Sequence, residues 1–187
     1  MEYLDNIPDK RIDKNTTSLK FKEDVIEFFK DKQLSSCLEV GTNRGWTTRV
    51  LSFLFDDVHT IEYSAKLVEE AKQHNNDRSN ITFHNIDARL PWNIDKEEFD
   101  VIFIDCIHSR EAVLSDISQG LKYSPKYIVF DDYGLPEEVP SVKEAVLDFL
   151  KHNKEFDIEI TYVGEPAGSE PRIGRRLVDW EGVILSV

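Results

Sequence analysis

The fold of this chain is decided by the stretch Cys37-Leu38-Glu39-Val40-Gly41-Thr42-Asn43-Arg44-Gly45-Trp46-Thr47-Thr48. A short apolar run ends at Gly41, a second glycine follows at Gly45, and apolar side chains then recur at helical spacing. This pattern predicts a buried strand over 36–41, a glycine turn, and a helix over 45–55. Glycines let a ligand approach the backbone closely, and the free N–H groups at a helix N-terminus can bind it. The stretch therefore predicts a cofactor-binding turn.

Outward from this stretch, predicted strands and helices alternate along the chain. The further helices cover 18–33, a segment capped by Ser64, 109–122, and a segment that opens with the capping box at Ser141. The further strands cover 58–62, 81–86, 99–105, 127–130, 156–163 and 181–187. Alternation of this kind predicts a parallel α/β sheet with helices on both faces. The last two strands are joined by a loop, so they must pair antiparallel.

Composition and charge narrow the class of protein. The chain has 187 residues, 40% of them hydrophobic, which predicts one globular domain: a polar arm over 1–17, an N-terminal helix over 18–33, and a Rossmann-like core over 35–187. The net charge of -13 repels phosphate backbones, so no nucleic-acid partner is expected. No apolar run reaches the roughly 20 residues of a membrane span, and no secretory signal is evident. We expect a cytoplasmic protein without membrane contact, and a homodimer is left open.

Acidic residues stand at the carboxyl ends of the predicted strands. They are Glu39, Glu62, Asp87, Asp105, Asp131 and Asp132. In an open α/β sheet, ligands bind outside these strand ends, so the acids should gather along one edge. Glu62 lies about 20 residues after Gly41, where a ribose-binding acid is found in dinucleotide sites.

The spacing of the glycines bears on the choice of cofactor. NAD sites use G-x-G-x-x-G, which leaves room for a pyrophosphate. Here Glu39 stands where the first glycine would be, and Gly41 and Gly45 follow. An acid at this position would repel a pyrophosphate, whereas it would suit a cofactor that carries an ammonium and a sulfonium group.

These motifs resemble those of the class I S-adenosylmethionine-dependent methyltransferases. The run from Glu39 to Thr47 is similar to the E-x-G-x-x-x-G-aromatic-Ser/Thr form of the small metal-dependent O-methyltransferases, of the catechol and caffeoyl-CoA type, and of the related sugar O-methyltransferases of natural products. Ile86-Asp87-Ala88, Phe99 to Asp105 and Val129 to Asp132 strengthen the resemblance, which covers about 35–150. It implies a Rossmann-like doubly wound sheet with strand order 3-2-1-4-5-7-6 and the last strand antiparallel.

The resemblance also implies roles for individual residues around S-adenosylmethionine. Glu39, Gly41 and Thr47 would hold its amino-acid part, Glu62 would hold the ribose, and Tyr63, Asp87 and Ala88 would lie at the adenine. The whole set expected to bind the cofactor is Glu39, Gly41, Thr42, Asn43, Gly45, Trp46, Thr47, Glu62, Tyr63, Asp87, Ala88 and Asp105.

Catalysis is expected across the sheet edge from the glycine turn. Asp105, Asp131 and Asp132 would repel one another unless a cation such as Mg²⁺ neutralised them. The catechol-type enzymes carry an Asp-Asn pair where this chain has Asp131-Asp132, which leaves the identity of the metal open. The alternative is that Asp105 contacts cofactor or substrate directly. His108 stands where those enzymes carry a catalytic lysine, so Asp105 and His108 are the expected catalytic residues, with His108 as the base.

The resulting prediction is a methyltransferase that acts on a hydroxyl group of a small molecule. Two alternatives stay open: a metal-independent methyltransferase of a nitrogen or protein acceptor, and a non-catalytic module that binds S-adenosylmethionine. The acceptor is not specified by the motifs. Arg172, Arg175 and Arg176 in the last loop could hold an anionic acceptor, but a solvated loop is favoured.

Overall fold

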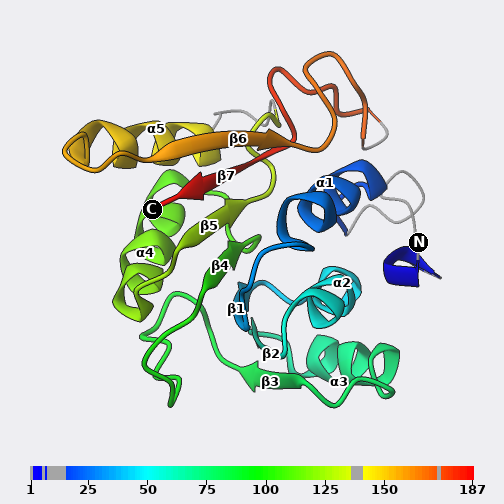
Figure 1. Ribbon diagram of the computed structural model, residues 1–187. Helices are drawn as coiled ribbons and strands as arrows, with labels where there is room; N and C mark the ends of the chain where they lie inside the picture. Colours follow the sequence, from blue (N-terminus) through cyan, green and yellow to red (C-terminus); the bar gives the residue numbers. More distant parts are fainter. Residues whose placement is uncertain (1, 6, 8–15, 136–140, 172–173) are drawn as a thin grey trace.

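The computed structural model describes residues 2–5, 7, 16–135, 141–171 and 174–187. Its centre is a seven-stranded sheet in the order β3-β2-β1-β4-β5-β7-β6 (Figure 1). The strands are β1 Ser36–Val40, β2 Asp57–Glu62, β3 Ile81–Asn85, β4 Val101–Ile104, β5 Tyr127–Phe130, β6 Glu159–Val163 and β7 Gly182–Ser186. The first five strands pair in parallel, and β7 is antiparallel to β5 and β6. The predicted Rossmann-like sheet and its strand order are confirmed.

Helices cover both faces of the sheet. They are η1 Glu2–Leu4, α1 Leu19–Phe29, α2 Trp46–Leu54, α3 Ala65–His74, α4 Arg110–Gly120, η2 Leu121–Tyr123 and α5 Ser141–His152. Figure 1 shows α1, α2 and α3 on one face and α4 and α5 on the other. The predicted N-terminal helix stops at Phe29 rather than at residue 33. Most of the predicted polar arm lies outside the described residues, but Tyr3 and Ile7 pack around α2.

The strands build the core on both faces of the sheet, because successive side chains along a strand point to opposite faces. In β1, Cys37 packs with Phe21 of α1, whereas Leu38 and Val40 pack with the apolar residues of α4 and α5. All five residues of β1 are buried, as expected for a central parallel strand. Both cysteines are free. No helix in the described part of the chain has the length and apolar character needed to cross a membrane.

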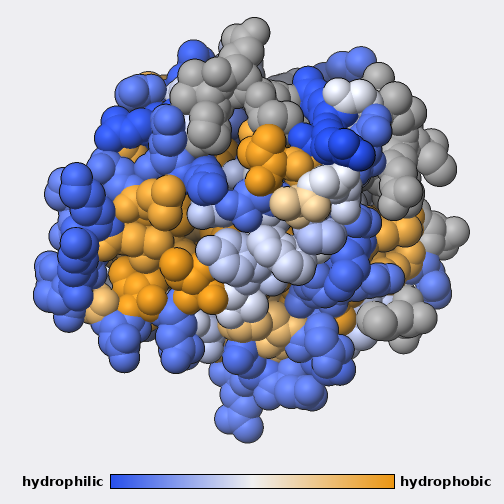
Figure 2. Space-filling model, turned by 90° about the horizontal axis from the view of Figure 1, so that it is seen from above, coloured by the Kyte–Doolittle hydropathy of each residue, from blue (hydrophilic) through white to orange (hydrophobic). Residues whose placement is uncertain are grey.

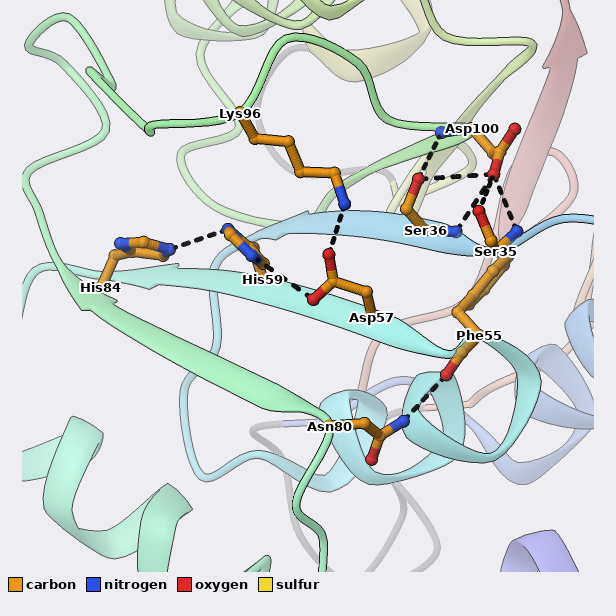
Figure 3. A network of polar contacts seen from close by, with 9 residues as sticks. All are labelled: Ser35, Ser36, Phe55, Asp57, His59, Asn80, His84, Lys96 and Asp100. Atoms are coloured by element: carbon orange, nitrogen blue, oxygen red, sulfur yellow. Dashed lines mark hydrogen bonds and ion pairs between the residues drawn. The ribbon is translucent and has the colours of Figure 1, made fainter.

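Asp100 holds strands together at the amino ends of the parallel strands, on the side of the sheet opposite the acidic carboxyl ends. Its Oδ2 accepts hydrogen bonds from the backbone N–H groups of Ser35 at 2.8 Å and Ser36 at 3.1 Å, as Figure 3 shows. Lys126 Nζ lies 2.7 Å from Oδ1. Burial raises the pKa of Asp100, but these hydrogen bonds outweigh burial and bring it to about 2. The carboxylate therefore joins the start of β1 to the chain entering β4.

Asp100→Asn is expected to lower the free energy of unfolding by about 1.5–3 kcal/mol, because it removes the charge from several hydrogen bonds. The folded pKa lies below the unfolded value of about 4, so the carboxylate stabilises the fold above pH 4. The difference from wild type should shrink as the pH falls toward 2. Urea unfolding at several pH values measures it, with exposed Asp95→Asn as the control. Equal stability of the two variants at pH 7 would contradict this role.

Helix α1 is also joined to the segments that flank β6 and β7. Glu181, fully buried just before β7, accepts hydrogen bonds from the backbone N–H groups of Ser18 at 3.0 Å and Glu165 at 3.1 Å. Ser18 is the N-cap of α1, and its hydroxyl also contacts Glu181. Gly164 N–H donates to Asp24 of α1 at 2.9 Å. The start of α1 is thus fastened to the C-terminal hairpin.

The outer edge of the sheet exposes apolar side chains. Seen from above, orange surface gathers on one side of the molecule (Figure 2). Large exposed apolar residues of α5, β6 and the loop between them are Leu147, Phe156, Ile160 and Tyr162. Single exposed apolar residues are common on protein surfaces, so this edge by itself identifies no partner.

Candidate cofactor site and active site

The glycine turn lies against the end of β4. Gly41 has a φ of 106° and Gly45 a φ of 77°, both in the left-handed region that favours glycine. The N–H groups of Gly41 and Thr42 donate to the carbonyl of Ile61 at 3.0 and 3.1 Å. A Cβ atom on Gly41 would lie 2.0 Å from the carbonyl oxygen of Asp105. The turn therefore requires glycine at position 41. The absence of a side chain there lets the turn lie against the backbone of Asp105.

Glu39 lies buried beneath this turn. Its Oε2 accepts hydrogen bonds from the hydroxyl groups of Thr48 at 2.5 Å and Thr60 at 2.6 Å. Burial raises the pKa of Glu39 to about 8, although both hydroxyl groups act in the opposite direction. A cationic ligand group nearby would favour the ionised form. This environment fits a cofactor that carries positive charge, as the motif predicted.

Glu62, at the end of β2, is held in a fixed orientation. Its Oε2 accepts from the N–H of Asn43 at 2.9 Å, and its Oε1 accepts from the N–H of Ser64 at 2.8 Å. Asn43 has a φ of 49°, so the turn is shaped to reach this carboxylate. Because backbone groups hold both oxygens, Glu62 presents its remaining lone pairs at the strand end. This geometry fits the predicted ribose site.

Next to Glu62 is a pocket of about 170 Å³ that we call the adenine pocket, after the group that the resemblance predicts there. Its lining residues are Ile61, Glu62, Tyr63, Ile86, Asp87, Ala88, Arg89, Cys106 and Ile107. Tyr63 is 70% exposed, so a ligand in this pocket could cover its ring. Asp87 forms a two-pronged ion pair with Arg89, at 2.6 Å between Oδ2 and Nη2, which lowers the pKa of Asp87. A ligand amine bound by Asp87 would therefore donate to a carboxylate that also accepts hydrogen bonds from Arg89.

Helix α2 starts at the turn and points its N-terminus toward the site. Its N-cap is Gly45, which offers no side chain to the first N–H groups. The ring of Trp46 stacks on His74 at 4.2 Å between ring centroids, so this side chain packs between α2 and α3. Thr47 Oγ1 lies 3.4 Å from Thr17 Oγ1. The ring of Trp46 is therefore engaged in helix packing. Thr42, another predicted cofactor residue, is buried, and its hydroxyl lies 2.5 Å from Thr60 Oγ1.

Asp105, His108 and Asp132 meet beyond the ends of β4 and β5. His108 Nε2 lies 3.5 Å from Asp105 Oδ1, and His108 Nδ1 lies 3.4 Å from Asp132 Oδ2. Burial lowers the pKa of His108, but the carboxylates around it outweigh burial and raise it to about 9. Asp132 has a φ of 57°, an uncommon conformation for a residue other than glycine that is often found at functional sites.

One atom of each of these three residues could ligate the same metal ion, since the atoms lie within 4.8 Å of one another. Asp131, a predicted metal ligand, is buried but does not belong to this group. His108, predicted as a base only, takes its place. In a strand, successive side chains point to opposite faces, so neighbouring acids at a strand end need not share a site.

Some residues at the site escaped the sequence motifs. Lys22 of α1 is buried, and its Nζ donates to the carbonyl of Thr17 at 2.6 Å, close to Thr47. The signal was a lysine on the apolar side of the predicted helix. Arg89 was also missed, although it stands beside Asp87. Arg172 lies outside the described residues, whereas Arg175 and Arg176 are exposed.

The fold and the site define the class of protein to which this chain is similar. The family model described as a methyltransferase domain matches residues 37–123. This match spans the glycine turn, the adenine pocket and His108. Sequence match and fold together confirm the predicted resemblance to the class I S-adenosylmethionine-dependent methyltransferases. No curated protein matches the chain.

Solved structures share the whole fold. An O-methyltransferase of tomaymycin synthesis from Streptomyces achromogenes, in complex with S-adenosylmethionine, is 16% identical with a TM-score of 0.68, covering 99% of this chain and 88% of that chain. An O-methyltransferase from Bacillus cereus, in complex with S-adenosylhomocysteine, is 20% identical with a TM-score of 0.65, covering 98% and 87%. An rRNA methylase from Streptococcus thermophilus is 14% identical with a TM-score of 0.60, covering 88% and 92%. These likenesses establish the fold and do not identify the acceptor.

Proposed function

We propose that this protein is an S-adenosylmethionine-dependent methyltransferase that methylates a hydroxyl group of a small molecule. The observation that carries the proposal is the closeness of two groups of residues. The glycine turn with buried Glu39 touches the backbone of Asp105, and the side chain of Asp105 belongs to the group with His108 and Asp132. A cofactor held at the turn would therefore have its reactive end beside an imidazole and two carboxylates.

The cofactor would be held at three points along the strand ends. Glu39 and the N-terminus of α2 would bind its amino-acid part, since the buried carboxyl favours a cation and the helix N–H groups favour a carboxylate. Glu62 would bind the ribose hydroxyls, and the adenine pocket would take the base. S-adenosylmethionine supplies a methyl group on a positively charged sulfur.

His108 in its neutral form is proposed as the base that accepts the proton of the acceptor hydroxyl. Because the neighbouring carboxylates raise the pKa of His108 to about 9, methyl transfer should become faster as the pH rises toward that value. One neighbouring carboxylate would orient the imidazole while the acceptor hydroxyl takes the place of the other at the second ring nitrogen. The hydroxyl oxygen would be placed to bond to the methyl carbon as the carbon–sulfur bond breaks, with S-adenosylhomocysteine as the leaving group. Two carboxylates beside the ring stabilise the imidazolium that results.

Asp105, His108 and Asp132 would also fit a divalent cation, which would lower the pKa of an acceptor hydroxyl. Two carboxylates suit Mg²⁺, whereas an imidazole nitrogen in the set favours a transition metal such as Mn²⁺. Either cation remains a proposal. A small molecule is proposed as acceptor rather than RNA because the net charge of -13 opposes RNA binding.

Calorimetry with S-adenosylhomocysteine tests the cofactor assignment. We expect wild-type protein to bind it with a Kd between about 1 µM and 1 mM, and Glu62→Gln to bind about 10- to 100-fold more weakly. Glu69→Gln on the exposed surface of α3 is the control. Absence of binding by wild type, with EDTA and with Mg²⁺ or Mn²⁺, would refute the assignment.

Product formation tests the chemistry. Release of S-adenosylhomocysteine from S-adenosylmethionine is measured with catechols, sugars and other hydroxyl compounds, with and without EDTA. Turnover that EDTA abolishes and a divalent cation restores supports the metal-dependent form. Turnover that is insensitive to EDTA, or that occurs only with nitrogen acceptors, supports the metal-independent alternative.

A further inference from the structure

Two histidines face each other across the outer strands of the sheet. His59 lies on β2 and His84 on the edge strand β3, and His84 Nε2 lies 3.1 Å from His59 Nδ1. In the pairing of these strands His84 stands opposite Ile61, so the two histidines are diagonal neighbours on one face of the sheet. Figure 3 shows a nitrogen of each ring turned toward the other ring. Two ring nitrogens therefore converge from two different strands.

The separation of these two nitrogens is close to the one that a single metal ion requires. Zn²⁺ binds imidazole nitrogens at about 2.0–2.1 Å, so two such ligands at the tetrahedral angle lie about 3.3 Å apart. Small rotations of the rings would bring the observed 3.1 Å to this value. Without a metal, one ring can donate a hydrogen bond to the other. A metal site requires in addition that both facing nitrogens are free of protons.

The surroundings of His59 favour a free lone pair on the nitrogen that faces His84. Asp57 Oδ1 lies 3.5 Å from His59 Nε2, the nitrogen on the other side of the ring. A carboxylate there favours the proton on Nε2 and leaves Nδ1 able to bind a metal, as in many metal-binding histidines. Lys96 contacts the other oxygen of Asp57 and holds this carboxylate in place. Phe99 packs edge-on against His59, with 5.1 Å between ring centroids.

The pair is accessible to water and suits a transition metal. Both rings are half-buried, and burial lowers the pKa of His59 and of His84, which favours the neutral imidazole that binds metals. Within the described ranges, no third histidine, cysteine or acid converges with these two nitrogens, so water would complete the coordination. Imidazole suits Zn²⁺, Cu²⁺ and Ni²⁺, whereas Mg²⁺ prefers oxygen ligands.

We propose that His59 and His84 form a metal site of their own, which takes Zn²⁺ or a similar divalent transition-metal ion and fastens β3 to β2. An edge strand has a hydrogen-bonded neighbour on one side only, so ligands from both strands would stabilise it directly. The site is separate from Asp105, His108 and Asp132, which meet beyond the ends of β4 and β5. It does not depend on the proposed function.

A metal at this pair would act on the strand that leads to the adenine pocket. Asn85 directly follows His84 in β3. Its Nδ2 donates hydrogen bonds to the backbone carbonyls of Glu62 at 2.9 Å and Tyr63 at 2.8 Å, two residues that line the pocket. Metal binding to β2 and β3 would therefore also stabilise the strand ends that carry this pocket.

Titration of the full chain with Zn²⁺, followed by NMR of the histidine rings, tests the site. The chain has five histidines, and single variants assign their signals. We expect the ring signals of His59 and His84 to shift together with a Kd of about 1–100 µM, and to be unaffected by Mg²⁺. The signal of His108 reports on the candidate active site in the same experiment. Unchanged His59 and His84 signals at about 1 mM Zn²⁺ would overturn the inference.

His84→Gln separates a metal ligand from a hydrogen-bond partner, because glutamine keeps an amide donor for His59 and is a poor ligand for Zn²⁺. The affinity measured at the His59 signal should fall by at least about 10-fold, and Zn²⁺ should raise the unfolding temperature less than in wild type. His152→Ala, at the exposed end of α5, is the control and should behave as wild type.

Equal Zn²⁺ responses of His59 in wild type and in His84→Gln would mean that the two rings form a hydrogen-bonded pair only, and would refute the site. If His84→Gln does not fold, then His59→Gln, followed at the His84 signal, gives the same comparison.

Discussion

Replacement of His108 by alanine is expected to lower kcat by about 100- to 10,000-fold, the usual contribution of a general base. The affinity for S-adenosylhomocysteine should stay within a few-fold of wild type, because Glu39, Glu62 and the adenine pocket are untouched. The loss of kcat is expected because both ring nitrogens of His108 lie within 3.5 Å of carboxylates beside the turn, where the acceptor hydroxyl would bind. Steady-state kinetics with saturating S-adenosylmethionine, together with calorimetry, measures both quantities.

His152→Ala is the control, because this exposed histidine at the end of α5 also lies 3.5 Å from an aspartate, Asp148, but away from the site. A kcat for His108→Ala equal to that of the control would rule out the base. If a higher concentration of Mn²⁺ or Mg²⁺ restores the activity of His108→Ala, then the imidazole serves as a metal ligand instead. Asp105→Asn should lower kcat as well, since it removes the charge beside the imidazole.

Gly41→Ala should destabilise the protein by about 3–5 kcal/mol and abolish cofactor binding. Two costs combine at this position. An alanine would have to adopt a φ of 106°, and its Cβ would lie 2.0 Å from the carbonyl oxygen of Asp105. Because this neighbour is backbone, it cannot move away without shifting β4. Urea unfolding and calorimetry with S-adenosylhomocysteine measure the two effects.

Gly168→Ala separates the two costs. Gly168 has a φ of 91°, similar to that of Gly41, but a Cβ atom there would meet nothing within 4 Å. This variant should therefore lose only about 1–2 kcal/mol, from the backbone conformation alone. Similar losses in the two variants would mean that the contact with Asp105 is relaxed at little cost, contrary to the role given to the turn.

The sheet and the turn could be predicted from the sequence because their signals are local. An apolar run such as 101–104 that ends in an acid specifies a buried strand, and two glycines around Asn43 specify the turn. The parallel order follows from the alternation with helices. The family resemblance predicts the strand order, and the observed pairing confirms it.

The side chains beyond the strand ends could not be predicted as well, because their directions depend on non-local backbone geometry. Asp132, rather than Asp131, lies beside His108. The backbone of Asp132 is in the left-handed region, a conformation that the spacing of residues in the sequence does not reveal. Trp46 packs on His74 because α3 lies beside α2. Asp116 resembles an ordinary polar residue until α4 is placed on the sheet, where the residue turns out to face the core.

The link between Ser18 and Glu181 has a consequence for the order in which the molecule is made. A ribosome releases the segment of α1 long before Glu181, the carboxylate that holds its N-cap, because the two residues are 163 positions apart in the sequence. Domains that depend on contacts between distant segments fold late and slowly. We therefore expect the nascent chain to leave α1 undocked until the segment of β7 has emerged from the ribosome, so that the sheet is covered by α1 only at that stage of synthesis.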